Sequence, residues 1–302
     1  MKTKSKTTLA TLITGLTVFS ASIHAQDFVT EWEGADGASI NTAGNWSSGL
    51  PTDLDDGEWG LIDTGNSLTM ADSEGAFNGM RLWLENGTIS NDERSARYLM
   101  DDFQLRMNGG NFTHGIGTTP GSNKQLILRD GTFLDLVGGT TNFVTAETEG
   151  LAFGSGGSGS GEARVDIRGG THTWGDVQFR QPNEGLNFLP GEYTLTLTNA
   201  TDPVDLGRDH TNFRFHLGGG SLIMSAFDST TPYDFEGNLW NAGELTFIDG
   251  GGSEFTNANG TFSDYFNVTD GNTLTAIPEP GTLMLLGIAF GTLILFRRRS
   301  GR

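Results

Sequence analysis

Apolar residues recur at fixed offsets around a series of glycines in the central part of the chain. The residue three places before each glycine is apolar in all eight units, and the residue five places before is apolar in six of them. A large side chain usually follows two places later, so the unit is apolar-x-apolar-x-x-Gly-x-apolar. The anchor glycines, which recur at unequal steps, are Gly65, Gly87, Gly110, Gly131, Gly170, Gly191, Gly220 and Gly251.

This alternation indicates strands with one buried face, and the glycine allows the backbone to bend into the next strand. The shorter steps, such as that from Gly65 to Gly87, suit one coil of a solenoid, so the pattern predicts an all-β, single-stranded parallel β-helix over residues 61–276. We expect Leu84, Met107, Leu128 and Ile167 to stack in one buried row. The long step from Gly131 to Gly170 is interpreted as two turns with a degenerate unit around Gly150. An antiparallel sandwich or barrel is the alternative, but it does not require the same offset to be apolar in every unit.

The segment before the first unit has a different pattern, with tryptophans and then acidic residues. We interpret residues 26–60 as an N-terminal cap, because the first coil has no neighbour on one side. Trp32, Trp46 and Trp59 are the bulky side chains expected to cover its apolar end.

The beginning of the chain has the order of a secretory signal. Three lysines, Lys2, Lys4 and Lys6, precede an apolar run from Leu9 to Ile23, and a small residue follows. We therefore predict a signal helix over residues 1–25, with cleavage between Ala25 and Gln26. An amphipathic first helix is the alternative, but no polar face interrupts the run.

Residues 281–296 form a second uncharged run, followed at once by Arg297, Arg298 and Arg299. Such a run makes a helix of about 24 Å, which is just long enough to cross a bilayer with help from flanking residues. The arginines would stay on the cytoplasmic side and everything upstream would lie outside the cytoplasm. A buried core helix is the alternative for so short a segment.

The residues just before this run complete a known pattern. Pro278, Glu279 and Pro280, then the apolar run, then the arginine cluster resemble the PEP-CTERM sorting signal, here residues 277–302. The resemblance implies processing by an exosortase, transient anchoring in the inner membrane, and delivery to the cell surface or extracellular matrix. The tryptophan-rich cap segment is also similar to the opening of autotransporter-like and other PEP-CTERM β-helical surface proteins.

The composition limits which partners and which chemistry the chain can have. The whole chain carries a formal charge of −19, and seven of its 18 basic residues lie in the two terminal signals, so the part between them is more acidic still. Such a surface repels nucleic acid, which we exclude as a partner. The chain has no cysteine, which excludes disulfides and thiol chemistry.

Candidate chemistry on this scaffold is sparse. Asp63 and Glu85 are the one adjacent carboxylate pair expected at equal outward offsets, and a solvated turn explains them as well. The four histidines outside the signal lack metal-ligand spacing, and His172 is interpreted as a half-buried row residue. Asp53 to Gly57 departs from the calcium-loop pattern. The histidines are His114, His172, His210 and His216.

We therefore expect no catalytic residue, metal or cofactor, and a non-enzymatic protein of the surface or matrix. The expected partners are the secretion machinery, the exosortase and the membrane, with extracellular polysaccharide as a candidate. The alternative is a secreted β-helix protein that binds or degrades polysaccharide.

Overall fold

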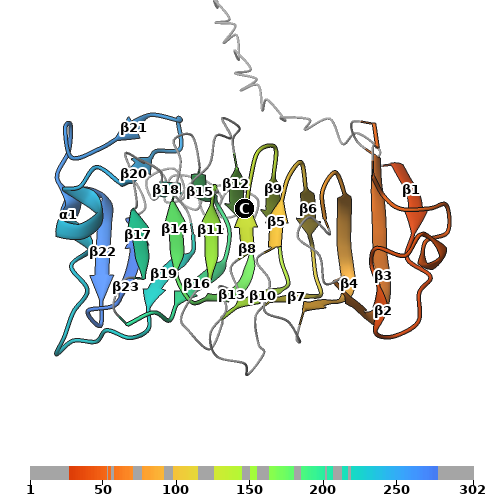
Figure 1. Cartoon of the computed structure of the whole chain (residues 1–302). Helices are drawn as coiled ribbons and strands as arrows, with labels where there is room; N and C mark the ends of the chain where they lie inside the picture. The colour runs from red at the N-terminus through yellow and green to blue at the C-terminus, as the bar shows by residue number, and fades with distance from the viewer. Residues whose placement is uncertain are drawn as a thin grey trace, which may run out of the picture.

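The computed structural model describes an all-β solenoid with few helices (Figure 1). This confirms the solenoid predicted from the glycine-centred repeat. The residues described are 27–52, 54–55, 58–70, 77–91, 98–114, 126–144, 150–154, 163–179, 185–200, 203–206, 213–216 and 219–277. The predicted signal helix over residues 1–25 and the predicted membrane helix over residues 281–296 lie outside them. Within the described ranges, no helix is long and apolar enough to cross a membrane.

The strands stack in three faces, and within each face neighbouring strands belong to successive coils and pair in parallel. The first face comprises β1 (Asp27–Glu31), the first parts of β3 (Glu58–Thr69) and β4 (Arg81–Asn91), then β6 (Gln104–Met107), β9 (Phe133–Leu136), β12 (Arg164–Ile167), β15 (Gly185–Phe188), β18 (Phe213–His216) and β20 (Leu245–Ile248). The second face comprises β2 (Ala38–Ser39), the last parts of β3 and β4, β7 (Asn111–His114), β10 (Thr140–Phe143), β13 (Gly170–Trp174), β16 (Tyr193–Leu197) and β19 (Ser221–Met224). The third face comprises β5 (Tyr98–Met100), β8 (Leu126–Leu128), β11 (Leu151–Phe153), β14 (Val177–Phe179) and β17 (Val204–Leu206).

The core is built from inward rows of apolar side chains, one residue from each coil. On the first face the row runs through Leu84, Met107, Leu136 and Ile167, all of them fully buried. The prediction that Leu128 belongs to this row is wrong, because Leu128 pairs with Met100 and Phe153 on the third face. Alternating side chains put the row inside the tube, where burial of each large residue contributes about 1.5–3 kcal/mol.

The corner between the first and second faces is made by glycines in the same register. Gly110, Gly139 and Gly170 precede or begin paired second-face strands and have φ values of 68°, 74° and 93°. A side chain at Gly139 would bring its Cβ to 2.7 Å from the carbonyl oxygens of Gly109 and Gly110, so the coils can approach only if this residue is glycine.

Gly131 was predicted as a corner of this series, but it lies between β8 and β9, where a side chain would meet Asp102. The predicted extra unit around Gly150 is therefore also wrong. On the first face Leu105, Leu134 and Val165 are paired neighbours, so each of these coils is longer than the step from Gly110 to Gly131 suggested. Loops of different length between the faces account for the unequal steps between the anchor glycines.

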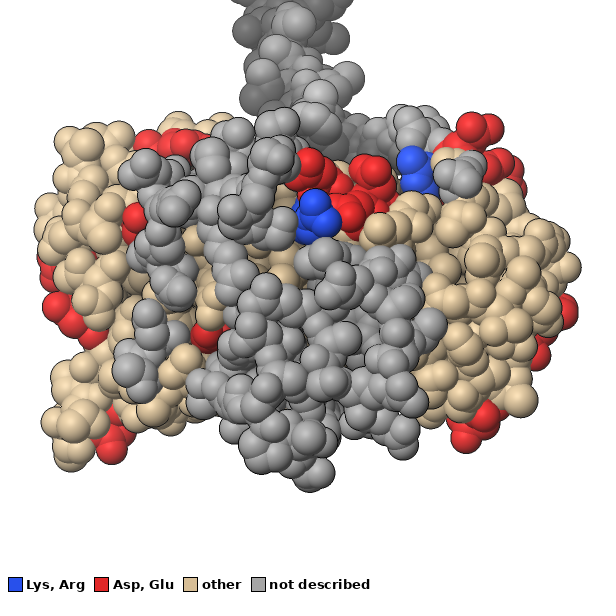
Figure 2. All heavy atoms as spheres, in the orientation of Figure 1, with Lys and Arg blue, Asp and Glu red and all other residues tan. Residues whose placement is uncertain are grey.

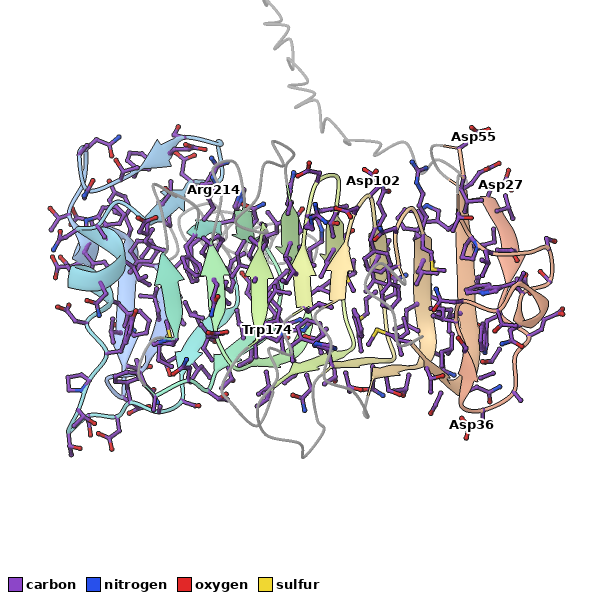
Figure 3. All side chains as sticks on the ribbon, in the orientation of Figure 1. Asp27, Asp36, Asp55, Asp102, Trp174 and Arg214 are labelled. Atoms are coloured by element: carbon purple, nitrogen blue, oxygen red, sulfur yellow. The ribbon has the colours of Figure 1, made fainter. Side chains whose placement is uncertain are left out.

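The N-terminal end of the tube is closed by its own segment. Trp32 and Trp46 are buried, face each other edge to face at 5.2 Å between ring centroids, and join their backbones in an antiparallel bridge. The Trp46 Nε1–H donates to the Ile40 carbonyl at 2.9 Å. Trp59, expected to share this role, instead lies half-buried on the exterior of the first face. The described segments of the cap are coloured red to orange in Figure 1, and Asp27, Asp36 and Asp55 lie around the same end in Figure 3.

The C-terminal end is closed by strands that run the other way. β23 (Thr273–Ala276) pairs antiparallel with β19 and with β22 (Phe266–Thr269), and β21 (Glu254–Phe255) pairs antiparallel with β20. Trp240, in a π-helical turn (Glu236–Trp240), packs against Phe266 and against Phe262 of the short helix α1 (Phe262–Tyr265). Reversing the strand direction interrupts the parallel template that a further coil could extend.

Candidate functional site

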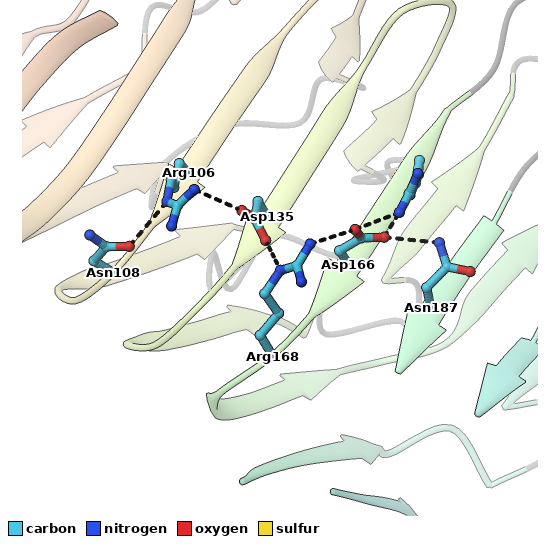
Figure 4. A network of polar contacts seen from close by, with 7 residues as sticks. Arg106, Asn108, Asp135, Asp166, Arg168 and Asn187 are labelled. Carbon is cyan, nitrogen blue, oxygen red and sulfur yellow. Dashed lines mark hydrogen bonds and ion pairs between the residues drawn. The ribbon is translucent and has the colours of Figure 1, made fainter. Parts of the chain in front are cut away.

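The exterior of the first face carries a row of polar side chains that follows the strand register. Trp83, Arg106, Asp135, Asp166 and Asn187 occupy the same outward position in β4, β6, β9, β12 and β15. Because outward residues of neighbouring coils lie about 4.8 Å apart, charged groups in this row can reach one another directly. Figure 4 shows the resulting network.

We call this network the arginine–aspartate ladder. It consists of Arg106, Asn108, Asp135, Arg164, Asp166, Arg168 and Asn187.

Two carboxylates form the centre of the ladder. Asp135 binds the Arg168 Nε at 2.7 Å and lies 3.5 Å from the Arg106 Nη1. Asp166 accepts two bonds from Arg164, at 2.6 and 2.7 Å, and one from Arg168 at 3.2 Å. The Asn187 amide adds a bond to Asp166 at 2.9 Å. Every oxygen of these two carboxylates therefore lies within 3.5 Å of a guanidinium or amide nitrogen.

Burial in the ladder is uneven. The Asp166 side chain is fully covered, whereas the side chains of Arg164 and Arg168 are 53% and 41% exposed. Both oxygens of this covered carboxylate are occupied by donors, so a substrate could reach them only if the arginines first moved away. The arginines, in contrast, keep part of their guanidinium groups at the surface.

An aromatic group adjoins the ladder at its N-terminal side. The Trp83 ring contacts Phe28 and Trp59 edge to face, with centroids 5.6 and 5.7 Å away, and the Arg106 guanidinium lies 4.6 Å from its centroid. The Trp83 Nε1–H donates to the Glu85 carboxylate at 2.5 Å. Phe28 is 39% exposed, and among the described residues only one other large apolar side chain, that of Val268, is similarly exposed. Trp83, the ring beside the cation, is buried, so Phe28 and the half-buried Trp59 are the rings of this group that reach the surface.

The arginines of the described residues are concentrated on this face. Five of the six arginines among the described residues project from it or follow its strands, whereas carboxylates are spread around the described surface, as the side visible in Figure 2 illustrates. The sixth, Arg129, pairs with Asp101 at 3.2 Å beside the third face. The five are Arg81, Arg106, Arg164, Arg168 and Arg214.

The carboxylate pair singled out in the sequence is not aligned. A register shift in β3 places Asp63 opposite Asn86 and not opposite Glu85. Glu85 accepts bonds from Trp83 and, at 2.8 Å, from the Asn108 amide. Asp55 is exposed and donates its backbone N–H to the Glu58 carboxylate, while Asp53 and Asp56 lie outside the described residues.

The histidines do not converge. His172 is fully buried inside the second face, where it was expected to be only half-buried, and burial lowers its pKa to about 4. His114 is also buried, and His216 projects from β18 with a pKa lowered mainly by burial. His210 lies outside the described residues. Among the residues that the structure describes, no three His, Asp or Glu side chains are grouped so that they could hold a metal ion.

Fold and exterior together define the class: a β-solenoid, closed at both ends of its described part, with a charge-paired ladder along one face. The model of the PEP-CTERM protein-sorting motif matches residues 276–299, so the chain carries this sorting motif behind a β-solenoid. The matched range contains Pro278, Glu279, Pro280 and the three arginines, all of which lie beyond the described residues. Comparisons with curated proteins and with solved structures found no match.

The motif has consequences for the route that the chain takes. It implies export, membrane-associated sorting, and an exosortase as the processing partner. It does not concern the surface of the solenoid, whose chemistry rests on the residues above.

Proposed function

We propose that this chain is a non-enzymatic protein of the cell surface or extracellular matrix, exported with a cleaved signal and tethered briefly to the inner membrane before exosortase processing. The observation that carries the non-enzymatic part is the arginine–aspartate ladder. General acid–base chemistry needs a carboxyl group that can exchange a proton with substrate, and Asp135 and Asp166 are both engaged by arginines.

The closed apolar core of the solenoid supports the same proposal. Inward rows of apolar residues run through successive coils, and both ends of the described solenoid are closed by aromatic side chains. Such a tube keeps its shape without disulfides, which the chain cannot form because it lacks cysteine. Its exterior is then free to contact other matrix components.

Polysaccharide binding is the second candidate function, and the aromatic group favours it. Phe28 and the half-buried Trp59 present rings at the surface, and the partly exposed Arg106, Arg164 and Arg168 follow on later coils of the same face. Rings and planar donors on one face suit an extended, hydroxyl-rich polymer.

The decisive experiment compares the full chain with a chain that lacks residues 278–302, both produced in a host that contains an exosortase. We expect the full chain to reach the surface or medium with a shortened C-terminus, and the truncated chain to stay in another fraction. A chain with Pro278 and Pro280 replaced by alanine is the matched control, because it keeps the apolar run. Identical distribution of all three forms would contradict the sorting proposal. As a second readout, the released protein is incubated with polysaccharides, and release of new chain ends would contradict the non-enzymatic role.

A further inference from the structure

The exterior of the second face carries two parallel ranks of short, uncharged polar side chains. Each strand contributes the same two outward positions, separated by one buried residue, and the ranks keep their register from β4 to β19 without a shift. We call this surface the hydroxyl face. Its first rank is Ser67, Thr88, Asn111, Thr140, Thr171, Thr194 and Ser221, and its second rank is Thr69, Ser90, Thr113, Asn142, Thr173, Thr196 and Ile223.

The composition of this surface differs sharply from the rest of the exterior. Thirteen of these fourteen described residues are Ser, Thr or Asn, and none is charged. Strand propensity favours threonine on any pleated surface and would act equally on the first face. There, however, four of the six outward residues from β4 to β18 are charged: they are Trp83, Arg106, Asp135, Asp166, Asn187 and Arg214. Propensity alone therefore does not explain the hydroxyl face.

The geometry of the hydroxyl face is that of a two-dimensional lattice. Neighbouring coils repeat at about 4.8 Å, and the two ranks lie about 6.7 Å apart, which is twice the rise per residue of a strand. Threonine is stiff at χ1, so each hydroxyl and methyl group keeps a fixed position at little entropic cost. The second-face strands β7, β10 and β13 lie along the lower edge of the solenoid in Figure 1. Asn111, Thr140 and Thr171 of the first rank are exposed to solvent, whereas the second rank is half-buried, with Ser90 buried and the Asn142 Oδ1 atom fully covered.

Two features limit what this lattice can bind. It lacks charged groups, so it offers nothing to an ionic partner, and its described ranks contain no aromatic ring on which a sugar could stack. What it does offer is hydroxyl and amide groups, which can bind water, alternating with methyl groups at repeats of about 4.8 Å and about 6.7 Å, comparable to the spacing of oxygen atoms on a prism face of hexagonal ice. Every β-solenoid repeats along its axis, so what distinguishes this face is that both ranks carry the same short polar groups, which suits a partner that is itself crystalline.

We propose that the hydroxyl face binds the surface of ice. Thr171, Thr173, Thr194 and Thr196 form the centre of the site, because they are two consecutive coils with threonine in both ranks. Waters held between these side chains continue the ice lattice onto the protein. An exported protein with this property would act on ice outside the cell.

The test measures incorporation of the full chain into slowly growing polycrystalline ice, in a mild detergent and beside a co-dissolved inert protein. The wild-type chain should be enriched in the ice fraction relative to that inert protein. A chain with Thr171→Tyr and Thr194→Tyr should lose the enrichment, because two rings would stand above the lattice at its centre. The matched control is Gln104→Tyr, which places the same ring on the first face and should leave the enrichment unchanged.

Three outcomes would overturn the proposal. The first is a wild-type chain excluded from ice to the same extent as the inert protein. The second is equal enrichment of the double variant, provided that circular dichroism shows both chains folded. The third is exclusion from ice combined with retention on microcrystalline cellulose or chitin that the double variant loses, because the lattice partner would then be a polysaccharide crystal.

Discussion

Replacing His172 tests whether the core of the second face holds a neutral imidazole. The Nε2 atom lies 2.9 Å from the Gly169 carbonyl, which can only accept, so Nε2 carries the proton. The Nδ1 atom lies 3.0 Å from the Thr141 hydroxyl, which donates to it, and that hydroxyl accepts the Trp174 Nε1–H at 2.8 Å. All three groups are buried, and Trp174 points into the solenoid in Figure 3. A second proton, on Nδ1, would reverse the bond to Thr141 and leave the Thr141 hydroxyl proton without this acceptor.

The loss of stability follows from the shift in the pKa of His172. Burial lowers the pKa of His172 from 6.5 to about 4, and the bond to Gly169 offsets only part of that effect. Between these values the unfolded chain binds a proton that the folded chain does not, so stability falls as the pH falls. The full difference is about 3 kcal/mol, of which about 2 kcal/mol is lost between pH 7 and pH 5.

Other groups titrate in the same range, so the assay compares two chains. Burial raises the pKa of Glu244 from 4.5 to about 7, and its protonation therefore favours the folded state as the pH falls, opposite to His172. In His172→Leu the contribution of Glu244 is unchanged and that of His172 is absent. Leucine fits the position, since its row neighbour is Leu195.

We expect the free energy of unfolding of the wild-type chain to fall by about 2 kcal/mol relative to His172→Leu between pH 7 and pH 5. Denaturation at a series of pH values gives the difference, and the ring signals of His172 in NMR spectra give its titration directly. Parallel pH curves for the two chains, or a His172 ring that becomes charged near pH 6.5, would refute the reasoning.

The remaining predictions concern the ladder and the corner. Asp166→Ala removes the partner of two arginines and should lower the free energy of unfolding by about 2 kcal/mol. Arg164→Ala leaves Asp166 bound to Arg168 and Asn187, so it should lower that free energy by about 1 kcal/mol or less. Thermal melts that rank the two variants in the opposite order would contradict the ladder. Gly139→Ala should destabilise by at least about 2 kcal/mol, because it combines a positive φ with contacts to two carbonyl oxygens. Gly250→Ala is the control, because a Cβ there meets nothing within 4 Å. Equal melting temperatures of the two variants would contradict this reasoning.

The solenoid could be predicted because its inward rows repeat at one offset from a glycine. Leu84, Met107 and Ile167 stack as expected. Leu128 was misplaced because its third-face strand is also apolar-x-apolar and is also followed by a glycine, Gly131. Any buried strand that ends at a tight corner produces this pattern, and only the pairing of coils tells the faces apart. Coil length could not be predicted, because loops between faces vary without affecting the core.

The same error concealed the ladder. Each of three ladder residues lies four places before a glycine of the corner between the first and second faces. The pairs are Arg106 and Gly110, Asp135 and Gly139, and Asp166 and Gly170. With Gly131 taken in place of Gly139, Asp135 drops out of the row and the opposite charges of neighbouring coils are no longer aligned. The aromatic group was missed because Trp59 had been assigned to the cap. A correct register is therefore needed before any exterior site on a solenoid can be recognised.

Alternation along each strand separates stability from surface chemistry. In the segment Thr171–His172–Thr173, the central residue contributes to the core and the two threonines contribute only to the exterior. Substitutions at Thr171 and Thr194 should therefore leave the buried rows intact, whereas substitution of His172 should leave both ranks of the hydroxyl face intact. If Thr171→Tyr and Thr194→Tyr unfolded the chain while His172→Leu abolished binding to ice, inward and outward positions would have been assigned to the wrong sides of the sheet. The two sets of variants thus check each other, because the pleat allows each to affect one side of the sheet only.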